Sequence, residues 1–260
     1  MDLPKGLVFE DYESVKELLI DFIKDYVKKA GVRGVVLGLS GGVDSSLVAT
    51  LACEALGPKK VLGIMLPVDA EKDDKNVEDA TLLAEKLGIQ HEIFELKQAV
   101  AAYKSLNLDK VALGNLTARL RMVTWYARAN QQNRLVLGTG NKTELMIGYF
   151  TKYGDGGTDI LPIGNLYKTN VWDLSKHLGL PEKIIEKAPS AGLWQGQTDE
   201  GEIGITYPEL DSILFLTLEK RLTEKEIVEW GISKEKVEKV LTMMKNSSHK
   251  RDPLPKPLAR

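Results

Sequence analysis

The stretch GLSGGVDSS, residues 38–46, decides the fold that we expect for this chain. It follows the apolar run 35–37 and precedes the apolar run 47–52, so it joins a buried strand to a helix. Gly41 and Gly42 let the backbone approach an anion closely. The N–H groups of residues 43–46 begin a helix and lack partners inside it, so they can point at that anion. The stretch therefore predicts a phosphate-binding turn, although it contains no lysine.

Strands and helices alternate along the rest of the chain. Apolar periodicity and glycine or proline stops predict helices over 11–30, 74–87, 115–131, 170–178, 208–218, 224–230 and 233–245, and strands over 34–39, 61–66, 90–96 and 134–138. This order is typical of βαβ units, so we expect an α/β fold with a doubly wound parallel sheet and flanking helices. Ligands bind outside the carboxyl ends of such strands, where we expect residues 38–46 and 138–144 to face each other. The glycine-containing segments 149–169 and 188–204 are predicted to be loops.

Composition narrows the class of protein. The 260 residues suffice for one large α/β domain, and we expect a single domain over 1–260. A net charge of −2 gives no basic excess, so we expect no nucleic-acid partner. No apolar stretch approaches the roughly 20 residues of a membrane span, and the start of the chain does not resemble a signal peptide, so we expect no membrane partner. The one cysteine, Cys53, excludes an internal disulfide and indicates a reducing, cytoplasmic compartment.

Asp44 is the unusual member of the turn, and two interpretations of it stay open. Aspartate is a good helix N-cap residue, and it is also a good ligand for a Mg²⁺ ion that bridges phosphates. Two other nucleotide motifs do not fit the chain. A Walker loop requires glycine where GTGNKTE (138–144) has Asn141, and a dinucleotide fingerprint requires G-x-G-x-x-G where residues 38–42 read GLSGG. Taken alone, Glu144 is most often a solvated acid of a first helical turn, and Lys168 a solvated loop lysine.

The motif S-G-G-x-D-S after a first parallel strand resembles the loop of the ATP pyrophosphatases, which cleave ATP between its α and β phosphates. Longer segments are similar, in order and spacing, to the ammonia-dependent NAD synthetase family: GNLTARLRM (114–122), GTGNKTELMIGYFTKYGDGG (138–157), LPIGNLYKT (161–169), PSAGLWQGQTDEGEIGITY (189–207) and HKR (249–251). The resemblance covers almost the whole chain. It implies an adenine nucleotide alpha hydrolase-like fold. It also implies a homodimer that converts deamido-NAD, ATP and ammonia to NAD, AMP and pyrophosphate through an adenylated intermediate.

The resemblance implies roles for the residues that match the family's motifs. Mg²⁺ would be held by Asp44 and Glu144. ATP would be bound by Gly38, Ser40, Gly41, Gly42, Val43, Asp44, Ser45, Arg121, Thr139, Lys168 and Ser190. Deamido-NAD would be bound by Arg119, Tyr149, Lys152, Asp155, His249 and Lys250, and the catalytic residues would be Asp44, Glu144, Asp155 and Lys168. The tail, residues 245–260, is expected to close over the ATP phosphates, against the alternative of a solvated basic tail.

One departure from the family concerns the dimer. The helix over 115–131 helps to form the dimer in the family, and some relatives carry an aromatic residue shortly before GN (114–115), where a partner subunit stacks on the substrate. This chain has LDKV at 108–111.

Cys53 bears on the nitrogen donor. Glutamine-using relatives attack the amide with a cysteine of an additional domain. We expect Cys53 to face the core, so ammonia is the donor that the sequence predicts.

Two alternatives to the leading interpretation remain. One is another ATP pyrophosphatase, such as a tRNA-modifying adenylating enzyme, which usually needs a basic surface or a pair of cysteines. The acidic balance and the single cysteine argue against it. The other alternative is a non-catalytic nucleotide-binding module. The joint presence of Asp44, Glu144, Lys168 and Lys250 argues against that one.

Overall fold

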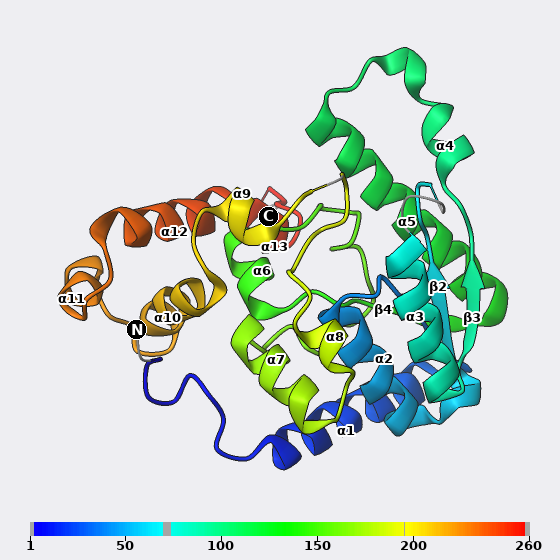
Figure 1. Ribbon diagram of the computed structural model, residues 1–260, viewed down its shortest axis with the longest axis horizontal. Coiled ribbons are helices and arrows are strands. Elements are labelled where there is room, and N and C mark those ends of the chain that lie inside the picture. Colours follow the sequence, from blue (N-terminus) through cyan, green and yellow to red (C-terminus); the bar gives the residue numbers. More distant parts are fainter. Residues whose placement is uncertain (1–2, 70–73, 195, 258–260) are drawn as a thin grey trace.

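The computed structural model of the protein describes residues 3–69, 74–194 and 196–257. Its centre is a parallel four-stranded sheet in the order β3-β2-β1-β4 (Figure 1). The strands are β1 (Gly34–Gly38), β2 (Val61–Met65), β3 (Gln90–Ile93) and β4 (Arg134–Leu137). Val35 of β1 lies opposite Val61 of β2 and Leu135 of β4, so β1 is an interior strand. The predicted parallel α/β sheet is confirmed.

The strand order reverses at β1. The chain moves outward from β1 to β2 and β3, and then returns to the other side of β1 to form β4. A ligand crevice opens at the carboxyl ends of the strands where the order reverses in this way. Each strand ends earlier than predicted, but the residues that follow stay bonded to the sheet. Leu39 N donates to Ile64 O at 3.0 Å, and Leu96 N donates to Pro67 O at 2.8 Å.

The helices begin and end close to the predicted residues where the apolar period is long. They are α1 (Tyr12–Ala30), α2 (Val43–Leu56), α3 (Asp74–Leu87), α4 (Lys97–Ala101), α5 (Lys110–Gln132), α6 (Lys142–Ile147), α7 (Lys168–His177), α8 (Glu182–Ile185), α9 (Asp199–Ile203), α10 (Tyr207–Leu218), α11 (Glu224–Glu229), α12 (Lys234–Asn246) and α13 (Ser248–Arg251), with 3₁₀ turns η1 (Pro58–Lys60) and η2 (Lys104–Leu106). Within the described residues, no helix is both long enough and apolar enough to cross a membrane.

Two differences from the predicted helices have local causes. The helices α4, α6, α8, α9 and α13 are four to six residues long, too short to show an apolar period. Helix α5 begins at Lys110, before the predicted residue 115, because the Asp109 carboxylate accepts a hydrogen bond from Ala112 N at 2.8 Å. That bond is an N-cap, which satisfies a backbone donor at the helix start.

Helices cover both faces of the sheet. Leu37 of β1 belongs to a buried core with Leu47 of α2, to which α1, α3 and α7 also contribute. Val36 of β1 belongs to a separate core with Val136 of β4 and Ala129 of α5. Successive side chains of a strand point to opposite faces, so the neighbours Val36 and Leu37 each need a covering layer. This arrangement is the doubly wound architecture that the sequence predicts.

A further group of helices, α6, α10, α11 and α12, encloses its own apolar core. Tyr207, Leu210, Ile227 and Val237 are fully buried there. Trp172 of α7 packs against this core and also against the core on the sheet. Figure 1 shows α6 and α7 between the sheet and these helices. The two helices are therefore fixed from both sides, and both carry a residue of the predicted site in the first turn, Glu144 in α6 and Lys168 in α7.

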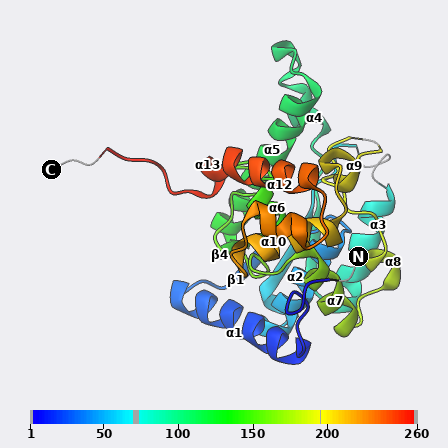
Figure 2. The same cartoon turned by 90° about the vertical axis from the view of Figure 1, so that its left-hand side faces the viewer.

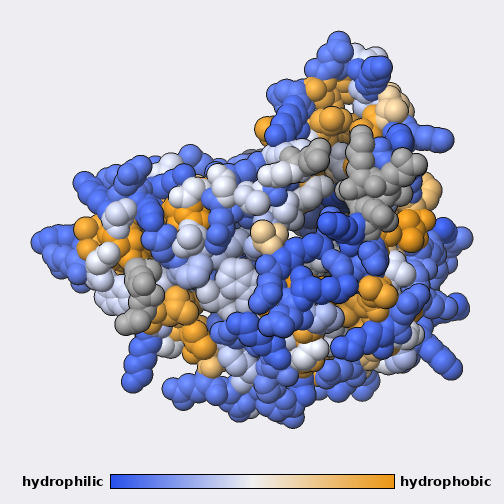
Figure 3. All heavy atoms as spheres, in the orientation of Figure 1, coloured by the Kyte–Doolittle hydropathy of each residue, from blue (hydrophilic) through white to orange (hydrophobic). Residues whose placement is uncertain are grey.

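An arm formed by α4, η2 and the first turns of α5 projects from the body (Figures 1 and 2). Large apolar side chains are exposed on it: Tyr103, Leu106, Val111 and Leu113. Apolar residues are also visible at the arm in the space-filling view (Figure 3). Exposed apolar side chains that occur singly are ordinary, but a group of them marks a surface suited to contact with another protein.

Candidate active site

A crevice of about 540 Å³ lies at the carboxyl ends of β1 and β2, where the switch in strand order predicts a ligand site. Most of the predicted site residues line it: Gly38, Ser40, Gly42, Val43, Asp44, Ser45, Arg121, Thr139, Glu144, Tyr149, Asp155, Lys168, Ser190 and Lys250. Four others, Gly41, Arg119, Lys152 and His249, do not line it. The structure therefore brings together segments from 38 to 250 at one place.

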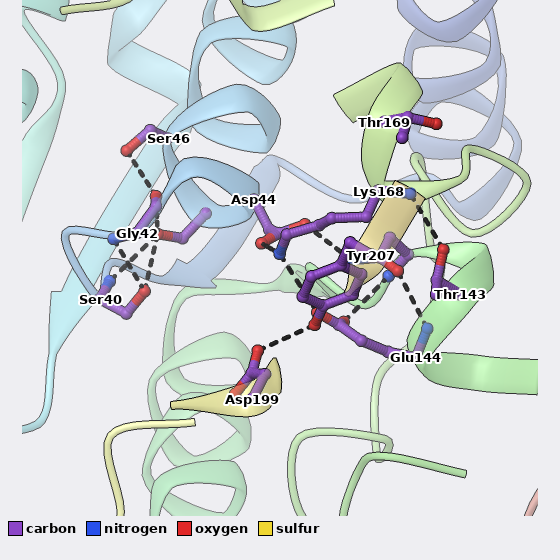
Figure 4. A network of polar contacts seen from close by, with 12 residues as sticks. Ser40, Gly42, Asp44, Ser46, Thr143, Glu144, Lys168, Thr169, Asp199 and Tyr207 are labelled. Atoms are coloured by element: carbon purple, nitrogen blue, oxygen red, sulfur yellow. Dashed lines mark hydrogen bonds and ion pairs between the residues drawn. The ribbon is translucent and has the colours of Figure 1, made fainter. Parts of the chain in front are cut away.

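The turn after β1 is held by its own hydroxyl groups (Figure 4). Ser45 Oγ lies 3.0 Å from Ser40 Oγ and accepts a hydrogen bond from Ser40 N at 3.2 Å. Ser46 Oγ donates to Gly42 O at 2.8 Å. Gly41 has a φ of +71°, and a Cβ there would lie 2.5 Å from Asn76 O, so glycine is required at this position. The N–H groups at the start of α2 are thus presented to the crevice in a fixed arrangement.

The N-cap of α2 is Gly42, so the interpretation of Asp44 as the N-cap residue is wrong. Asp44 lies in the first turn of α2, and its side chain reaches across the crevice. Asp44 Oδ1 accepts a hydrogen bond from Asn141 Nδ2 at 2.9 Å, and Asp44 Oδ2 accepts one from Lys168 Nζ at 2.5 Å. The residues 38–46 and 138–144 therefore face each other as predicted.

Lys168 is a buried helix residue, which corrects its interpretation as a solvated loop lysine. It is the first residue of α7 and is 2% exposed. Its backbone N–H donates to Thr143 Oγ1 at 2.9 Å, and Thr143 in turn donates to Asp211 Oδ1 at 2.5 Å. These buried bonds fix the start of α7 against the start of α6.

Lys168 Nζ lies between two carboxylates (Figure 4): Asp44 Oδ2 at 2.5 Å and Glu144 Oε1 at 3.4 Å. Burial alone would lower the pKa of Lys168, but Asp44 and Glu144 together raise it above its ordinary value. Burial also raises the pKa of Glu144, and the nearby Asp44 adds to this effect while Lys168 opposes it. Both carboxylates are mostly buried, with 19% and 17% of their side-chain surface exposed. With both carboxyl groups ionised, the trio carries one more negative charge than positive, so a bound cation would favour the ionised form of Glu144.

The donor set fits a Mg²⁺ ion that is shared with a nucleotide. Among the described residues, no three or more His, Cys, Asp or Glu side chains are grouped as a metal site of their own. Mg²⁺, however, typically uses one or two protein carboxylates and completes its shell with water and substrate phosphates. Asp44 and Glu144 supply that number of carboxylates beside the phosphate-binding turn.

Helix α5 and the loop 188–194 form two walls of the crevice. A Cβ at Gly38 would lie 2.5 Å from the ring of Trp125, so the indole of α5 packs directly against the end of β1. Arg121 Nε, also on α5, donates to Leu66 O at 3.2 Å. Lys110 Nζ, at the start of α5, lies 4.1 Å from the ring centre of Trp194 in the loop, so the two walls are in contact there. Backbone, guanidinium and aromatic groups are thus all available to a nucleotide.

The residues that the resemblance assigns to deamido-NAD form a second group. Arg119 Nη2 donates to Lys152 O at 3.3 Å, and Lys152 Nζ donates to His249 O at 2.5 Å. Lys250 Nζ donates to Gly148 O at 2.6 Å and lines the crevice. Lys152 therefore contacts both Arg119 and His249, and none of the three lines the crevice.

Residues 248–251 are docked on the carboxyl end of α6. Arg251 Nη1 donates to Leu145 O at 3.0 Å and to Met146 O at 2.8 Å. Residues 248–251 therefore form an ordered helix on the body, whereas residues 252–257 run away from it (Figure 2). Residues 258–260 of the predicted tail lie outside the described part of the chain.

Three polar side chains at or behind the crevice were not predicted as site residues. Asp199 is 3% exposed, lines the crevice and accepts a hydrogen bond from Tyr207 Oη at 2.9 Å. Burial raises the pKa of Asp199. Asn141 binds Asp44, although the sequence analysis noted it only as a missing glycine. Lys187 also lines the crevice. Asp199 and Lys187 flank a loop without periodicity, so no sequence signal distinguishes them from solvated charges.

Comparison with known proteins gives a consistent result. The family model described as NAD synthase matches residues 15–254. An NH(3)-dependent NAD(+) synthetase of Pyrococcus horikoshii is 49% identical over 245 residues, which cover 93% of this chain and 93% of the relative. Another, of Methanosarcina acetivorans, is 46% identical over 252 residues, which cover 95% of this chain and 98% of the relative.

Solved structures agree over the same length. The NMN synthetase of Francisella tularensis has a TM-score of 0.84 at 37% identity, with 96% of this chain and 100% of that chain covered. The NH3-dependent NAD synthetase of Campylobacter jejuni, in complex with nitrate, has a TM-score of 0.82 at 33% identity, with the same coverage. A family model that matches almost the whole chain, and relatives nearly half identical to it, show that the chain belongs to the NAD synthase family.

Proposed function

We propose that this chain amidates deamido-NAD with ammonia in the crevice, using ATP and releasing NAD, AMP and pyrophosphate. Ammonia-dependent NAD synthesis is the activity that its family membership supports. The observation that carries the location is the buried trio Asp44–Lys168–Glu144, which faces a phosphate-binding turn at the switch point of the sheet. The roles of individual residues below are part of this proposal.

The first step activates the substrate carboxylate, because a carboxylate oxygen is a poor leaving group. A carboxylate oxygen of deamido-NAD attacks the α-phosphorus of ATP, the bond from that phosphorus to the bridging oxygen breaks, and pyrophosphate leaves. Ser40, Ser45 and the N–H groups of residues 43–45 are placed to bind the departing phosphates, whereas Ser46 N already donates to Gly42 O at 3.1 Å. Preorganised donors of this kind stabilise charge as it develops in the transition state.

Asp44 and Glu144 would hold Mg²⁺ beside the phosphates. The ion would neutralise the charge that builds on the departing pyrophosphate. Lys168 keeps the two carboxyl groups close together, and it lines the same crevice as the turn, so it is placed to contact ATP. These three side chains are the ones whose charges the first step depends on.

The second step replaces AMP by nitrogen. Ammonia attacks the carbonyl carbon of the acyl adenylate, the bond from that carbon to the AMP oxygen breaks, and the nitrogen loses a proton. Asp155 lines the crevice and has one oxygen bound to Thr151 N at 2.9 Å, so its other oxygen can accept that proton. Tyr149 supplies an aromatic face for the nicotinate ring.

The proposal includes a single functional domain, a closing segment at residues 248–251 and a homodimer. The closing segment is supported by Lys250, which lines the crevice while bound to Gly148 O. The dimer is supported by the exposed apolar side chains of the arm, among them Leu106 and Val111, at 61% and 63% exposure. A monomer in solution at assay concentration would contradict the dimer.

One incubation tests the function. Purified protein receives ATP, Mg²⁺, ammonium and deamido-NAD, and the products are identified by mass spectrometry. We expect NAD, AMP and pyrophosphate in equal amounts. A parallel incubation replaces deamido-NAD with nicotinate mononucleotide, because one solved neighbour is an NMN synthetase. Faster amidation of the mononucleotide would contradict the substrate, and ADP with inorganic phosphate would contradict the bond that is cleaved.

A further inference from the structure

Lys187 approaches the phosphate-binding turn from a distant part of the sequence. Lys187 Nζ donates to Gly41 O at 3.2 Å and to Asp79 Oδ2 at 2.8 Å. Its side chain lines the crevice and is 30% exposed, so it is neither buried nor free in solvent. The turn itself, residues 38–46, has no lysine. Lys187 therefore places an ammonium group beside a loop that lacks one of its own.

Asp79 holds this ammonium in place without cancelling the local charge. Asp79 Oδ1 lies 2.8 Å from Lys183 Nζ while Asp79 Oδ2 binds Lys187. Burial opposes ionisation of this carboxyl, but the hydrogen bonds from Lys183 and Lys187 hold the pKa of Asp79 below its ordinary value. Asp79 is shared between two ammonium groups, so it does not by itself neutralise Lys187.

Lys168, another lysine that lines the crevice, is in the opposite situation. Lys168 is shared between Asp44 and Glu144, so its ammonium charge is already neutralised. The side of the turn that faces Lys187 thus presents an ammonium group to a phosphate, and the side that faces Lys168 presents carboxyl groups to a cation. ATP with bound Mg²⁺ carries both an anionic end and a cation, and it can satisfy the two sides at once.

We propose that Lys187 binds the terminal phosphate of ATP and, after cleavage, the pyrophosphate. This inference rests on the proposed function and adds a residue to it. Two of the three ammonium protons are used by Gly41 O and Asp79 Oδ2, which leaves the third for a phosphate oxygen. A charge-assisted bond to phosphate is stronger than a neutral one. Lys187 therefore takes the part that a lysine inside the loop plays in other phosphate-binding turns.

The same contact connects the phosphates to the loop that forms a wall of the crevice. Lys187 follows α8, which lies against α2, and it precedes the loop residues 188–194 that line the crevice. Ser190, three residues later, is one of the residues predicted to bind ATP. When phosphate binds Lys187, this segment is held against the turn.

Binding of magnesium pyrophosphate tests the proposal directly. We expect calorimetry to give an affinity for pyrophosphate at least about tenfold weaker in Lys187→Met than in the wild type, which corresponds to about 1.4 kcal/mol. The affinity for AMP is expected to stay within about twofold, because AMP lacks the terminal phosphates. Lys183→Met is the matched control. Lys183 is the other partner of Asp79, and its side chain is 54% exposed. We expect its replacement to change neither the pyrophosphate affinity nor the AMP affinity.

Kinetics provide a second measurement. The KM for ATP is expected to rise in Lys187→Met, while the KM for deamido-NAD stays unchanged. A pyrophosphate affinity within twofold of the wild type, or an equal loss of AMP affinity, would overturn the role of Lys187. Either result is separate from a failure of the proposed function, which would appear as no NAD formed by the wild-type protein.

A footprint on the unmodified protein covers the case in which Lys187→Met does not fold. Lysines are acetylated with and without magnesium pyrophosphate and then quantified by mass spectrometry. Protection of Lys187, with Lys183 labelled equally in both samples, is the expected result. Equal labelling of Lys187 in both samples would overturn the proposal.

Discussion

Replacement of Lys168 by methionine is expected to destabilise the protein strongly, because it leaves two mostly buried carboxylates without a counter-ion. Lys168 is 2% exposed and is shared between Asp44 at 2.5 Å and Glu144 at 3.4 Å. Breaking a buried ion pair by removal of one partner costs about 3–5 kcal/mol. For a chain of this size, 1 kcal/mol shifts the melting temperature by about 2–4 °C, so we expect Tm to fall by roughly 6–20 °C.

Thermal unfolding followed by circular dichroism measures this shift. Lys176→Met is the matched control on the same helix, since Lys176 is 65% exposed and lies 3.8 Å from Asp173. A surface pair contributes about 0–1 kcal/mol, so the control is expected to lose little stability. Added Mg²⁺ is expected to restore part of the Tm of Lys168→Met, because a cation can replace the missing ammonium group between the two carboxylates.

The pH dependence provides a further check on Lys168→Met. Burial already raises the pKa of Glu144 in the wild type, and loss of Lys168 removes the charge that opposes this rise. The folded variant then binds more protons than the unfolded chain between the unfolded pKa and the raised folded pKa, so its stability falls as pH rises through that window. The deficit relative to the wild type is therefore expected to shrink as the pH is lowered. A Tm of Lys168→Met within about 2 °C of the wild type would refute the reasoning.

Three further outcomes follow from the site. Asp44→Asn and Glu144→Gln each leave Lys168 one carboxylate, so we expect smaller losses of Tm than in Lys168→Met. Turnover is expected to fall at least about a hundredfold, because a metal ligand contributes several kcal/mol. Wild-type rates in either variant would assign that acid a structural role. A chain that ends at Asn246 loses the contacts of residues 250 and 251 with backbone carbonyls, so we expect a modest loss of Tm and a sharp fall in activity. Unchanged steady-state rates would exclude the closing role of the tail. Burial raises the pKa of the Cys53 thiol, so we expect Cys53→Ser to remain active with ammonium. The rate at fixed total ammonium is expected to rise with pH, because more neutral ammonia forms. Equal rates with ammonia-free glutamine would overturn ammonia as the donor.

The parts of the fold that could be predicted are those set by local patterns. Apolar periodicity gave α3 its observed bounds, and the glycine-rich turn after β1 has the strand and the helix that the sequence predicts on either side. The parts that could not be predicted depend on contacts between distant residues. The sequence leaves Asp44 open between a helix cap and a metal ligand, and the cap is excluded only by the fold, in which Gly42 is the N-cap and Asn141, 97 residues away, binds the Asp44 carboxylate. Lys168 reads as a solvated lysine until the packing of α7 buries it.

Pairing across the chain also explains why Asp199 and Lys187 were missed. Each is flanked by residues without an apolar period, and each gains its place only from a partner. Asp199 is held by Tyr207 of α10, and Lys187 is held by Asp79 of α3 and by Gly41. A single sequence without its fold contains no signal that joins these positions.

The indole of Trp125 packed against Gly38 gives the protein an optical reporter of its own crevice. The chain has four tryptophans, and two of them, Trp125 and Trp194, line the crevice. Indole emission shifts in wavelength and intensity with the polarity of its surroundings, so a bound nucleotide changes the fluorescence of an unlabelled sample. Trp172 in the core and Trp230, 42% exposed beyond the end of α11, provide a constant background. Comparison with Trp125→Phe and Trp194→Phe then assigns the fluorescence change to the α5 wall or to the loop wall of the crevice. The same change allows nucleotide occupancy of the crevice to be followed in real time during turnover.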